Sequence, residues 1–219
     1  VPYAEALALL PAYLQRLSLE SNGKRVTRDG TPVDGRTVPA LWGGIGTDGQ
    51  HAFFQWLHQG TDVVPVEFIV PAVPVRGDPT RHALLVANAL AQAQALALGR
   101  SPEAVVAELE KRGLAASATA VAVRVCPGDR PSTTIVTPRL DARTLGALLA
   151  LYEHRTFVEG ILWGINPFDQ FGVELGKILA DPIVAALVDG SELAPGTDAS
   201  TRALVAHVRA LMRHEPPSD

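Results

Sequence analysis

Apolar residues recur along the chain with two different periods, and these periods predict its helices and strands. Spacings of three and four predict a helix from Ala4 to about Leu17 and a long alanine-rich helix from Pro79 to Leu98. Residues Val63 to Val70 are rich in β-branched residues and do not alternate between apolar and polar, which is typical of a parallel strand covered on both faces, and Ser132 to Thr137 predicts another strand. Strands that alternate with helices predict an α/β sandwich with a mostly parallel sheet.

Shorter patterns complete this arrangement. Pro39 to Gly43 resembles a short buried strand, and Thr47 or Asp48 can cap a helix from about Gly49 to His58. The glycines between the two elements predict a tight connection. Apolar periodicity with cap residues predicts further helices over residues 101–112, 141–159, 183–188 and 201–213.

Composition narrows the class of protein. A chain of 219 residues with 47% hydrophobic and 19% charged content can bury one substantial core, with room for a small appendage. The net charge of -4 and the lack of any basic run argue against a nucleic-acid surface. Cys126 has no cysteine partner in the chain and fits a reducing compartment. No apolar run approaches the roughly 20 residues of a membrane span, and no signal peptide opens the chain, so we expect a soluble, cytoplasmic protein.

Charged and amide side chains gather around a predicted helix start near Asp169, which follows an asparagine and a proline. Gln170, Glu174 and Lys177 are spaced by four and three residues, so a helix over this segment would place them on one face. Taken alone, Glu174 and Lys177 are better interpreted as a surface ion pair. The surrounding sequence changes that interpretation.

The segment Gly160 to Lys177 closely resembles the C-terminal signature of the glucose-6-phosphate isomerase family, also called the phosphoglucose isomerase family. Four other blocks follow the family's pattern in the family's order, so the resemblance covers nearly everything from Tyr13 to about Ala180. These blocks are Leu19–Lys24, Trp42–Gln55 with His58–Gly60, Val64–Ile69 and Leu145–His154.

The resemblance implies a three-layer sandwich of the sugar-isomerase type with a mostly parallel sheet. We expect residues 1–180 to form the C-terminal sugar-isomerase domain and residues 181–219 to form a helical arm, with a disordered tail from Glu215. The family's N-terminal half, which holds its phosphate-binding loop and a catalytic arginine, has no counterpart in the chain. We therefore expect a fragment, a processed chain or part of a bifunctional protein.

The resemblance also implies an activity, the interconversion of glucose 6-phosphate and fructose 6-phosphate by ring opening and a cis-enediol intermediate. Glu20 matches the family's proton-transferring glutamate, since one carboxylate beside a planar enediol can serve both carbons. His51 matches the histidine of ring opening, which in the family comes from the neighbouring subunit, so a homodimer is implied. Lys177 matches the lysine that contacts the ring oxygen, and Gln170 is expected to line the same pocket. Without the motifs, Glu20 and His51 would be ordinary surface residues of helices.

Secondary roles follow from the same comparison. Many family members have a glutamine four positions before the glutamate, where this chain has Arg16 beside Gln15, so either residue is a candidate for substrate binding. Glu174 is expected to orient Lys177, and Asp169 to cap the helix. Lys24 and Thr47 are interpreted mainly as loop structure.

No cofactor and no metal are expected. One cysteine with scattered histidines and acidic residues offers no paired ligand spacing, and the glycines around Gly43 to Gly49 do not have dinucleotide-binding spacing. The alternative to an enzyme is a non-catalytic module that binds sugar phosphates for regulation. A module of that kind has no need of Glu20, His51 and Lys177 together, which disfavours it.

Overall fold

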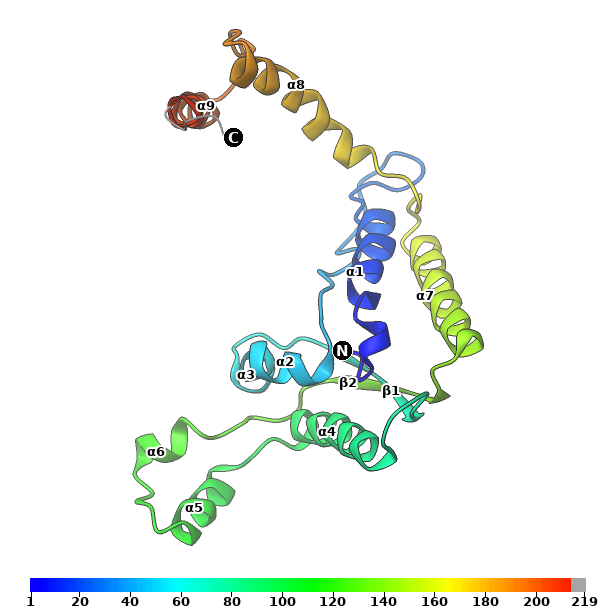
Figure 1. Cartoon of the computed structure of the whole chain (residues 1–219), viewed down its shortest axis with the longest axis vertical. Helices are drawn as coiled ribbons and strands as arrows, with labels where there is room; N and C mark the ends of the chain where they lie inside the picture. The colour runs from blue at the N-terminus through cyan, green and yellow to red at the C-terminus, as the bar shows by residue number, and fades with distance from the viewer. Residues whose placement is uncertain (214–219) are drawn as a thin grey trace. The chain divides into compact units, whose positions relative to one another are not determined.

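The computed structural model describes residues 1–213, and the chain divides into two compact units, residues 1–168 and 169–219 (Figure 1). The tail expected from Glu215 lies outside the described residues. The domain boundary expected after residue 180 falls inside helix α8 (Glu174–Val188), and the division into a domain and an arm stays a prediction. Within the described part of the chain, no helix has both the length and the hydropathy to span a bilayer.

The first unit is built on a parallel sheet. Strand β1 (Val66–Val73) pairs in parallel with β2 (Ser132–Arg139), with Val66 opposite Ser132 and Val70 opposite Val136. The other edge of β1 pairs with the first residues of the chain, because the Tyr3 amide donates to the Ile69 carbonyl at 2.8 Å. Since β1 is paired on both edges and covered on both faces, its residues other than Glu67 are apolar without alternation, as the sequence pattern indicated.

Helices cover both faces of β1 and form two separate apolar clusters. Phe68 and its neighbours on one face pack against α3 (Phe54–Gln59) and α4 (Pro79–Leu98). Ile69 on the opposite face packs against Leu10 and Leu14 of α1 (Leu10–Leu14) and against Leu148 and Tyr152 of α7 (Ala142–Leu162). The predicted three-layer α/β sandwich with a parallel sheet is confirmed.

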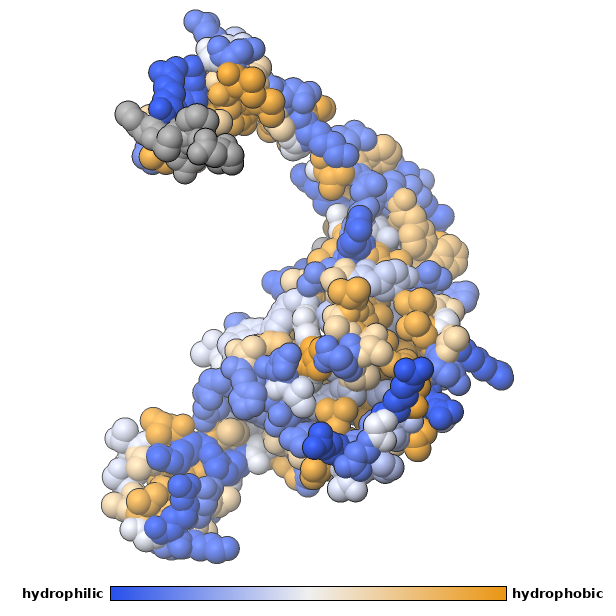
Figure 2. All heavy atoms as spheres, viewed as in Figure 1, coloured by the Kyte–Doolittle hydropathy of each residue, from blue (hydrophilic) through white to orange (hydrophobic). Residues whose placement is uncertain are grey.

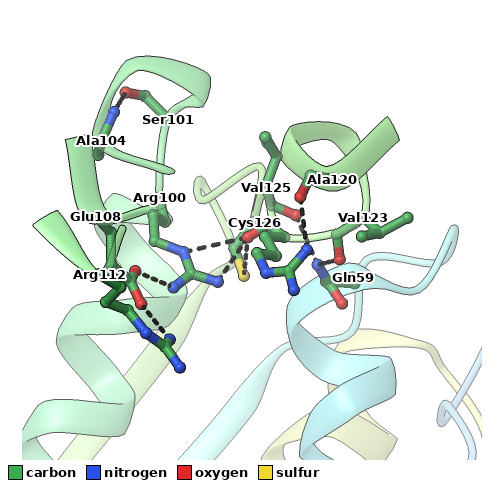
Figure 3. Close-up of polar contacts among 11 residues, drawn as sticks. Gln59, Arg100, Ser101, Ala104, Glu108, Arg112, Ala120, Val123, Val125 and Cys126 are labelled. Carbon is green, nitrogen blue, oxygen red and sulfur yellow. Dashed lines mark hydrogen bonds and ion pairs between the residues drawn. The ribbon is translucent and has the colours of Figure 1, made fainter. Parts of the chain in front are cut away.

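Residues between α4 and β2 leave the sheet and return to it. They form α5 (Pro102–Lys111), which agrees with the helix predicted over residues 101–112, and the short α6 (Ala118–Ala122), which was not predicted. Arg100 closes this excursion, because its guanidinium donates to Glu108 at 2.8 Å and to the Arg124 carbonyl at 2.7 Å (Figure 3). Gln59 of α3 donates to the Val125 carbonyl at 2.7 Å and so fixes the returning chain.

The second unit consists of a short 3-10 turn, η3 (Phe171–Val173), followed by α8 and α9 (Ala199–Met212). The Asp198 carboxylate caps α9 by accepting from the Thr201 amide at 3.0 Å. Only Ala186 and Val205 are buried among the described residues of this unit. Apolar side chains of α8 reach the surface, as the orange spheres in Figure 2 show.

The single helix predicted from Ala4 to Leu17 is wrong in its continuity. The structure contains a 3-10 turn, η1 (Glu5–Leu7), then α1, then the π-helix η2 (Gln15–Glu20). Pro11 explains the restart of the helix at Leu10, because proline has no amide hydrogen and fits only in the first turn.

Two further predictions near residue 45 need correction. Residues 39–43 form an extended loop instead of a strand, and the Trp42 ring packs edge-on against Phe53 with 4.7 Å between ring centroids. The predicted helix over residues 49–58 is two helices, α2 (Gly46–Ala52) and α3, which are interrupted at Phe53. The Pro2 carbonyl accepts from the Gly46 amide at 2.9 Å, so α2 begins before Thr47 and Asp48 and neither of them caps it.

Candidate active site

Glu20 is the last residue of the π-helix η2, and it is half-buried. In a π-helix each amide bonds the carbonyl five residues earlier, instead of four as in an α-helix, so the turn is wider. Short π segments occur often at functional sites. Gln15, which is half-buried, and Arg16, which is exposed, lie on the same six-residue segment. The sequence predicted a helix end at Glu20, but no local signal showed that its last turn is widened.

Each residue after Glu20 supports this turn in a different way. The Lys24 ammonium donates to the Glu20 carbonyl at 2.9 Å and to the Ser21 carbonyl at 2.7 Å. Asn22 is fully buried, and its Nδ2 donates to the Thr156 carbonyl of α7 at 2.9 Å. A Cβ atom at Gly23 would collide with the Leu19 carbonyl, which accepts from the Gly23 amide at 2.9 Å. The structural role predicted for Lys24 agrees with these contacts.

His51 lies near the end of α2, and its side chain is exposed. The helix that carries it is fixed on its buried side, where a Cβ atom at Gly46 would overlap the Tyr3 ring. Gln50, the residue before the histidine, donates to the Tyr3 hydroxyl at 2.9 Å. The glycines here are required by close packing, because neither Gly46 nor Gly49 has a positive φ angle.

Lys177 and Glu174 lie in the first turn of α8, three residues apart, and both side chains are exposed. Gln170 does not share their helix, because it precedes the 3-10 turn η3 and has a φ of -147°. Asp169 caps neither η3 nor α8, whose N-cap residues are Gln170 and Val173. Phe171–Val173 form a separate 3-10 turn, so the α-helix begins at Glu174 and not near Asp169.

The six candidate residues are therefore divided between the two units. Glu20, His51, Gln15 and Arg16 belong to the first unit, on η2 and α2. Gln170 and Lys177 belong to the second unit, before and within α8. Each of the six side chains is at least partly accessible to solvent.

Sequence reasoning missed a charged cluster beneath the sheet. Tyr152 of α7 donates its hydroxyl hydrogen to Glu67 of β1, and the Arg155 guanidinium lies 3.6 Å from the same carboxylate. Burial, followed by the contact with Glu67, raises the pKa of Tyr152 well above its usual range. These side chains line a cavity of about 530 Å³, which none of the six candidate residues lines. A single glutamate inside an otherwise apolar strand was the available signal.

Arg155 also has a partner on its own helix. Its Nε donates to Glu159 at 2.8 Å, and this hydrogen bond, ahead of other causes, raises the pKa of Arg155. Because Glu67 and Arg155 compensate each other's charge, the cluster joins β1 to α7 across the layer boundary. We interpret it as structural.

Among residues 1–213, no three His, Cys, Asp or Glu side chains gather closely enough to hold a metal ion.

The fold and the positions of these residues define a class of protein, the α/β sandwiches of the sugar-isomerase type. The family model described as phosphoglucose isomerase matches residues 1–205. The chain belongs to the phosphoglucose isomerase family, and the resemblance drawn from its sequence motifs is confirmed.

Curated relatives support the same assignment. A glucose-6-phosphate isomerase of Methylocella silvestris is 52% identical over 212 residues, which is 96% of this chain. One from Xanthobacter autotrophicus is 54% identical over 214 residues, again 96% of this chain. The chain spans 39% of the length of each of these relatives.

A solved structure supports the fold. The crystal structure of a glucose-6-phosphate isomerase from Chlamydia trachomatis superposes with a TM-score of 0.73 at 37% identity. It covers 96% of this chain, while this chain covers 37% of it.

Proposed function

We propose that the chain is the portion of a glucose-6-phosphate isomerase that supplies Glu20, His51 and Lys177 to the interconversion of glucose 6-phosphate and fructose 6-phosphate. One observation carries the proposal: the family match spans residues 1–205 and so includes all three side chains. Relatives that are 52% and 54% identical over 96% of the chain bear the name of that enzyme.

Each proposed group has one task in the reaction. His51 and Lys177 assist ring opening, in which the bond between C1 and the ring oxygen breaks, the ring oxygen gains a proton and the C1 hydroxyl loses one. The Glu20 carboxylate then takes the proton from C2, the electrons of that C–H bond form the C1–C2 double bond, and the C1 carbonyl oxygen takes the displaced electron pair and a proton to give the enediol. The C2 hydroxyl then loses its proton as the C2 carbonyl forms, and Glu20 returns its proton to C1 to give the ketose. The reaction is redox-neutral overall, so no external oxidant or reductant is consumed.

Substrate binding falls to polar side chains beside these groups. We assign substrate binding to Gln15 and Arg16, which lie on the same segment as Glu20, and to Gln170, which precedes the helix of Lys177. An amide can accept from one sugar hydroxyl and donate to another, and a guanidinium matches a phosphate group. The exposure of Arg16 and Gln170 supports a role for them in contacting a ligand.

The proposed pocket needs more than this chain. His51 and Lys177 are exposed, whereas proton abstraction next to a carbonyl is favoured where water is excluded. We therefore propose a homodimer in which the partner subunit brings its His51 to the site, together with the portion of the enzyme that this chain does not span. A sugar-phosphate substrate, a cytoplasmic location, and no nucleic-acid or membrane partner belong to the same proposal.

The test is isomerase activity of the full-length protein on fructose 6-phosphate, followed by coupled oxidation of the glucose 6-phosphate that forms. The Glu20→Gln variant keeps the shape of the side chain but removes the base, so kcat should fall by about 10²–10⁴-fold. Glu110→Gln on the exposed surface of α5 is the matched control and should leave kcat unchanged.

Full activity in Glu20→Gln would overturn the assigned base. Binding of fructose 6-phosphate by the wild-type protein without any turnover, measured by calorimetry, would favour the regulatory sugar-phosphate module instead.

A further inference from the structure

The turn that ends at Glu20 is fixed by a cation from its own loop. The last carbonyls of a helix have no amide donor within the helix. Here the Lys24 ammonium satisfies two of them, at 2.9 Å to the Glu20 carbonyl and 2.7 Å to the Ser21 carbonyl. One of these two contacts is to the backbone of the residue that carries the carboxylate. Lys24 therefore restricts the backbone of Glu20 directly.

A second attachment joins the same turn to α7. Asn22 is fully buried, and its Nδ2 donates to the Thr156 carbonyl at 2.9 Å. The orientation of the amide is settled by chemistry, because a carbonyl oxygen can only accept. The other amide atom, Oδ1, is buried without a hydrogen-bond partner among the described residues, which lowers stability. The hydrogen bond between Asn22 and Thr156 fixes the distance between residue 22 and α7. An apolar residue of the same size could not form this hydrogen bond.

We propose that Lys24 and Asn22 are positioning residues for the Glu20 carboxylate. The inference rests on the proposed function, since it concerns the base of that reaction. The carboxylate must reach two adjacent carbons in turn, and a displacement of about 1 Å can cost about 10²-fold in rate. Lys24 holds the turn along its axis from the C-terminal side, and Asn22 holds it laterally against α7. Neither residue needs to contact the substrate for this role.

Three variants of the full-length protein separate positioning from ordinary support of the fold. Lys24→Met keeps the length of the side chain without its donors, and kcat should fall by about 10–100-fold with KM changed less than about threefold. Lys24→Arg restores donors to the two carbonyls and should return kcat to within about threefold of the wild type. Asn22→Leu should lower kcat by about tenfold while the melting temperature stays level or rises, because it removes the buried Oδ1.

Arg124→Met is the matched control. Arg124 donates to the Ala120 carbonyl at 2.7 Å at the end of α6, so it supports a helix terminus in the same way as Lys24, but far from Glu20 in the sequence. Its loss should lower the melting temperature without changing kcat per folded molecule. If Lys24→Met behaves in the same way as this control, the positioning role is wrong.

A partitioning experiment keeps the test valid even if a variant folds poorly. With fructose 6-phosphate in deuterated water, the proton that Glu20 carries either returns to the sugar or exchanges with solvent. The fraction that exchanges is a ratio per turnover, so it does not depend on how much protein is folded. A displaced carboxylate in Lys24→Met and Asn22→Leu should raise this fraction at least twofold, whereas Arg124→Met should match the wild type. An unchanged fraction in both site variants would overturn the inference.

The outcomes also distinguish the inference from the function on which it rests. A wild-type protein without isomerase activity would refute the proposed function itself. An active wild type with an inactive Glu20→Gln, combined with wild-type kinetics and partitioning in Lys24→Met and Asn22→Leu, would refute the positioning role alone.

Discussion

The two units of this chain bury their apolar residues to very different extents. In the first unit, two clusters on either side of β1 include fully buried side chains such as Phe68 and Val70. In the second unit, Leu175 and Ile178 of α8 are 63% and 65% exposed, and only Ala186 and Val205 are buried among its described residues. Since burial of apolar area is the main stabilising term in folding, the first unit has a core, whereas the described part of the second unit buries few of its apolar side chains.

The difference bears directly on the proposed chemistry. The turn that carries Glu20 belongs to the unit with a core and is fixed by hydrogen bonds from Lys24 and Asn22, whereas Lys177 lies on a helix whose apolar side chains remain accessible. We therefore expect the side chain of Lys177 to adopt a fixed direction only when other protein surfaces pack against α8. The proposed need for a partner subunit and for the remainder of the enzyme follows from this contrast.

Truncation of a core residue should separate the two units most strongly. Phe68→Ala removes a fully buried ring from the cluster of the first unit and should lower its free energy of unfolding by about 3–5 kcal/mol. All three tryptophans lie in this unit, so denaturant unfolding followed by tryptophan fluorescence measures it specifically.

The matched change in the second unit is Leu179→Ala, at a side chain that is 55% exposed. It should alter stability by less than about 0.5 kcal/mol, as measured by amide hydrogen exchange along α8. A loss as large as that of Phe68→Ala would mean that α8 is already covered in the isolated chain.

Glycine substitutions should act in opposite directions in the two units. In Gly46→Ala, the new methyl group overlaps the Tyr3 ring, so we expect a loss of about 1–3 kcal/mol by tryptophan fluorescence. In Gly176→Ala, the methyl group meets no atom within 4 Å, so α8 should gain about 0.5–1 kcal/mol in helix stability by hydrogen exchange. A Gly46→Ala protein with unchanged stability would contradict the close packing of α2 on Tyr3.

The smallest expected effect is a pH dependence at the two aspartate caps. The Thr144 amide lowers the pKa of Asp141 at the start of α7, and the Thr201 hydroxyl and amide lower the pKa of Asp198 at the start of α9. A folded pKa below the unfolded value of about 3.9 means that each cap stabilises its helix above that pH. The contribution is lost as pH falls through the folded pKa.

The measurement is a comparison of Asp141→Asn and Asp198→Asn with the wild type between pH 2 and pH 6. Asparagine keeps a capping oxygen but does not titrate, so each variant should lose part of the acid dependence. Fluorescence should detect the change for Asp141 alone, and hydrogen exchange in α9 the change for Asp198. Identical pH profiles for wild type and variants would show that the caps remain uncharged or unformed.

Much of the fold could be predicted because it depends on local signals. Pro79 and the following alanines gave α4 from Pro79 to Leu98, with the bounds that the structure has. The start of α7 near Asp141 and the strand β1 were likewise predicted from local signals, namely a cap residue and a run of residues that does not alternate. The same holds for Glu20 and His51 as candidates, because the motifs around them are long.

Other features could not be predicted because they depend on contacts between distant segments. The start of α2 at Gly46 is set by the Pro2 carbonyl, and the extended conformation of residues 39–43 accompanies the packing of Trp42 on Phe53. The separation of Gln170 from the helix of Lys177 depends on a 3-10 turn that the apolar period does not reveal. In each case the local sequence allows more than one conformation, and tertiary contacts determine which one forms.

Because Gln15–Glu20 form a π-helix, the side on which Glu20 lies depends on the number of residues in this segment. Removal of one residue between Leu14 and Glu20 would let the widened turn relax to ordinary α-helical winding, in which each amide bonds the carbonyl four residues earlier instead of five, and this would change which side chains the turn presents on each side. Insertions and deletions in this stretch are therefore more damaging than most substitutions in it. In related sequences, an unchanged length of this segment would be a better marker of a working base than the identity of any one of its side chains.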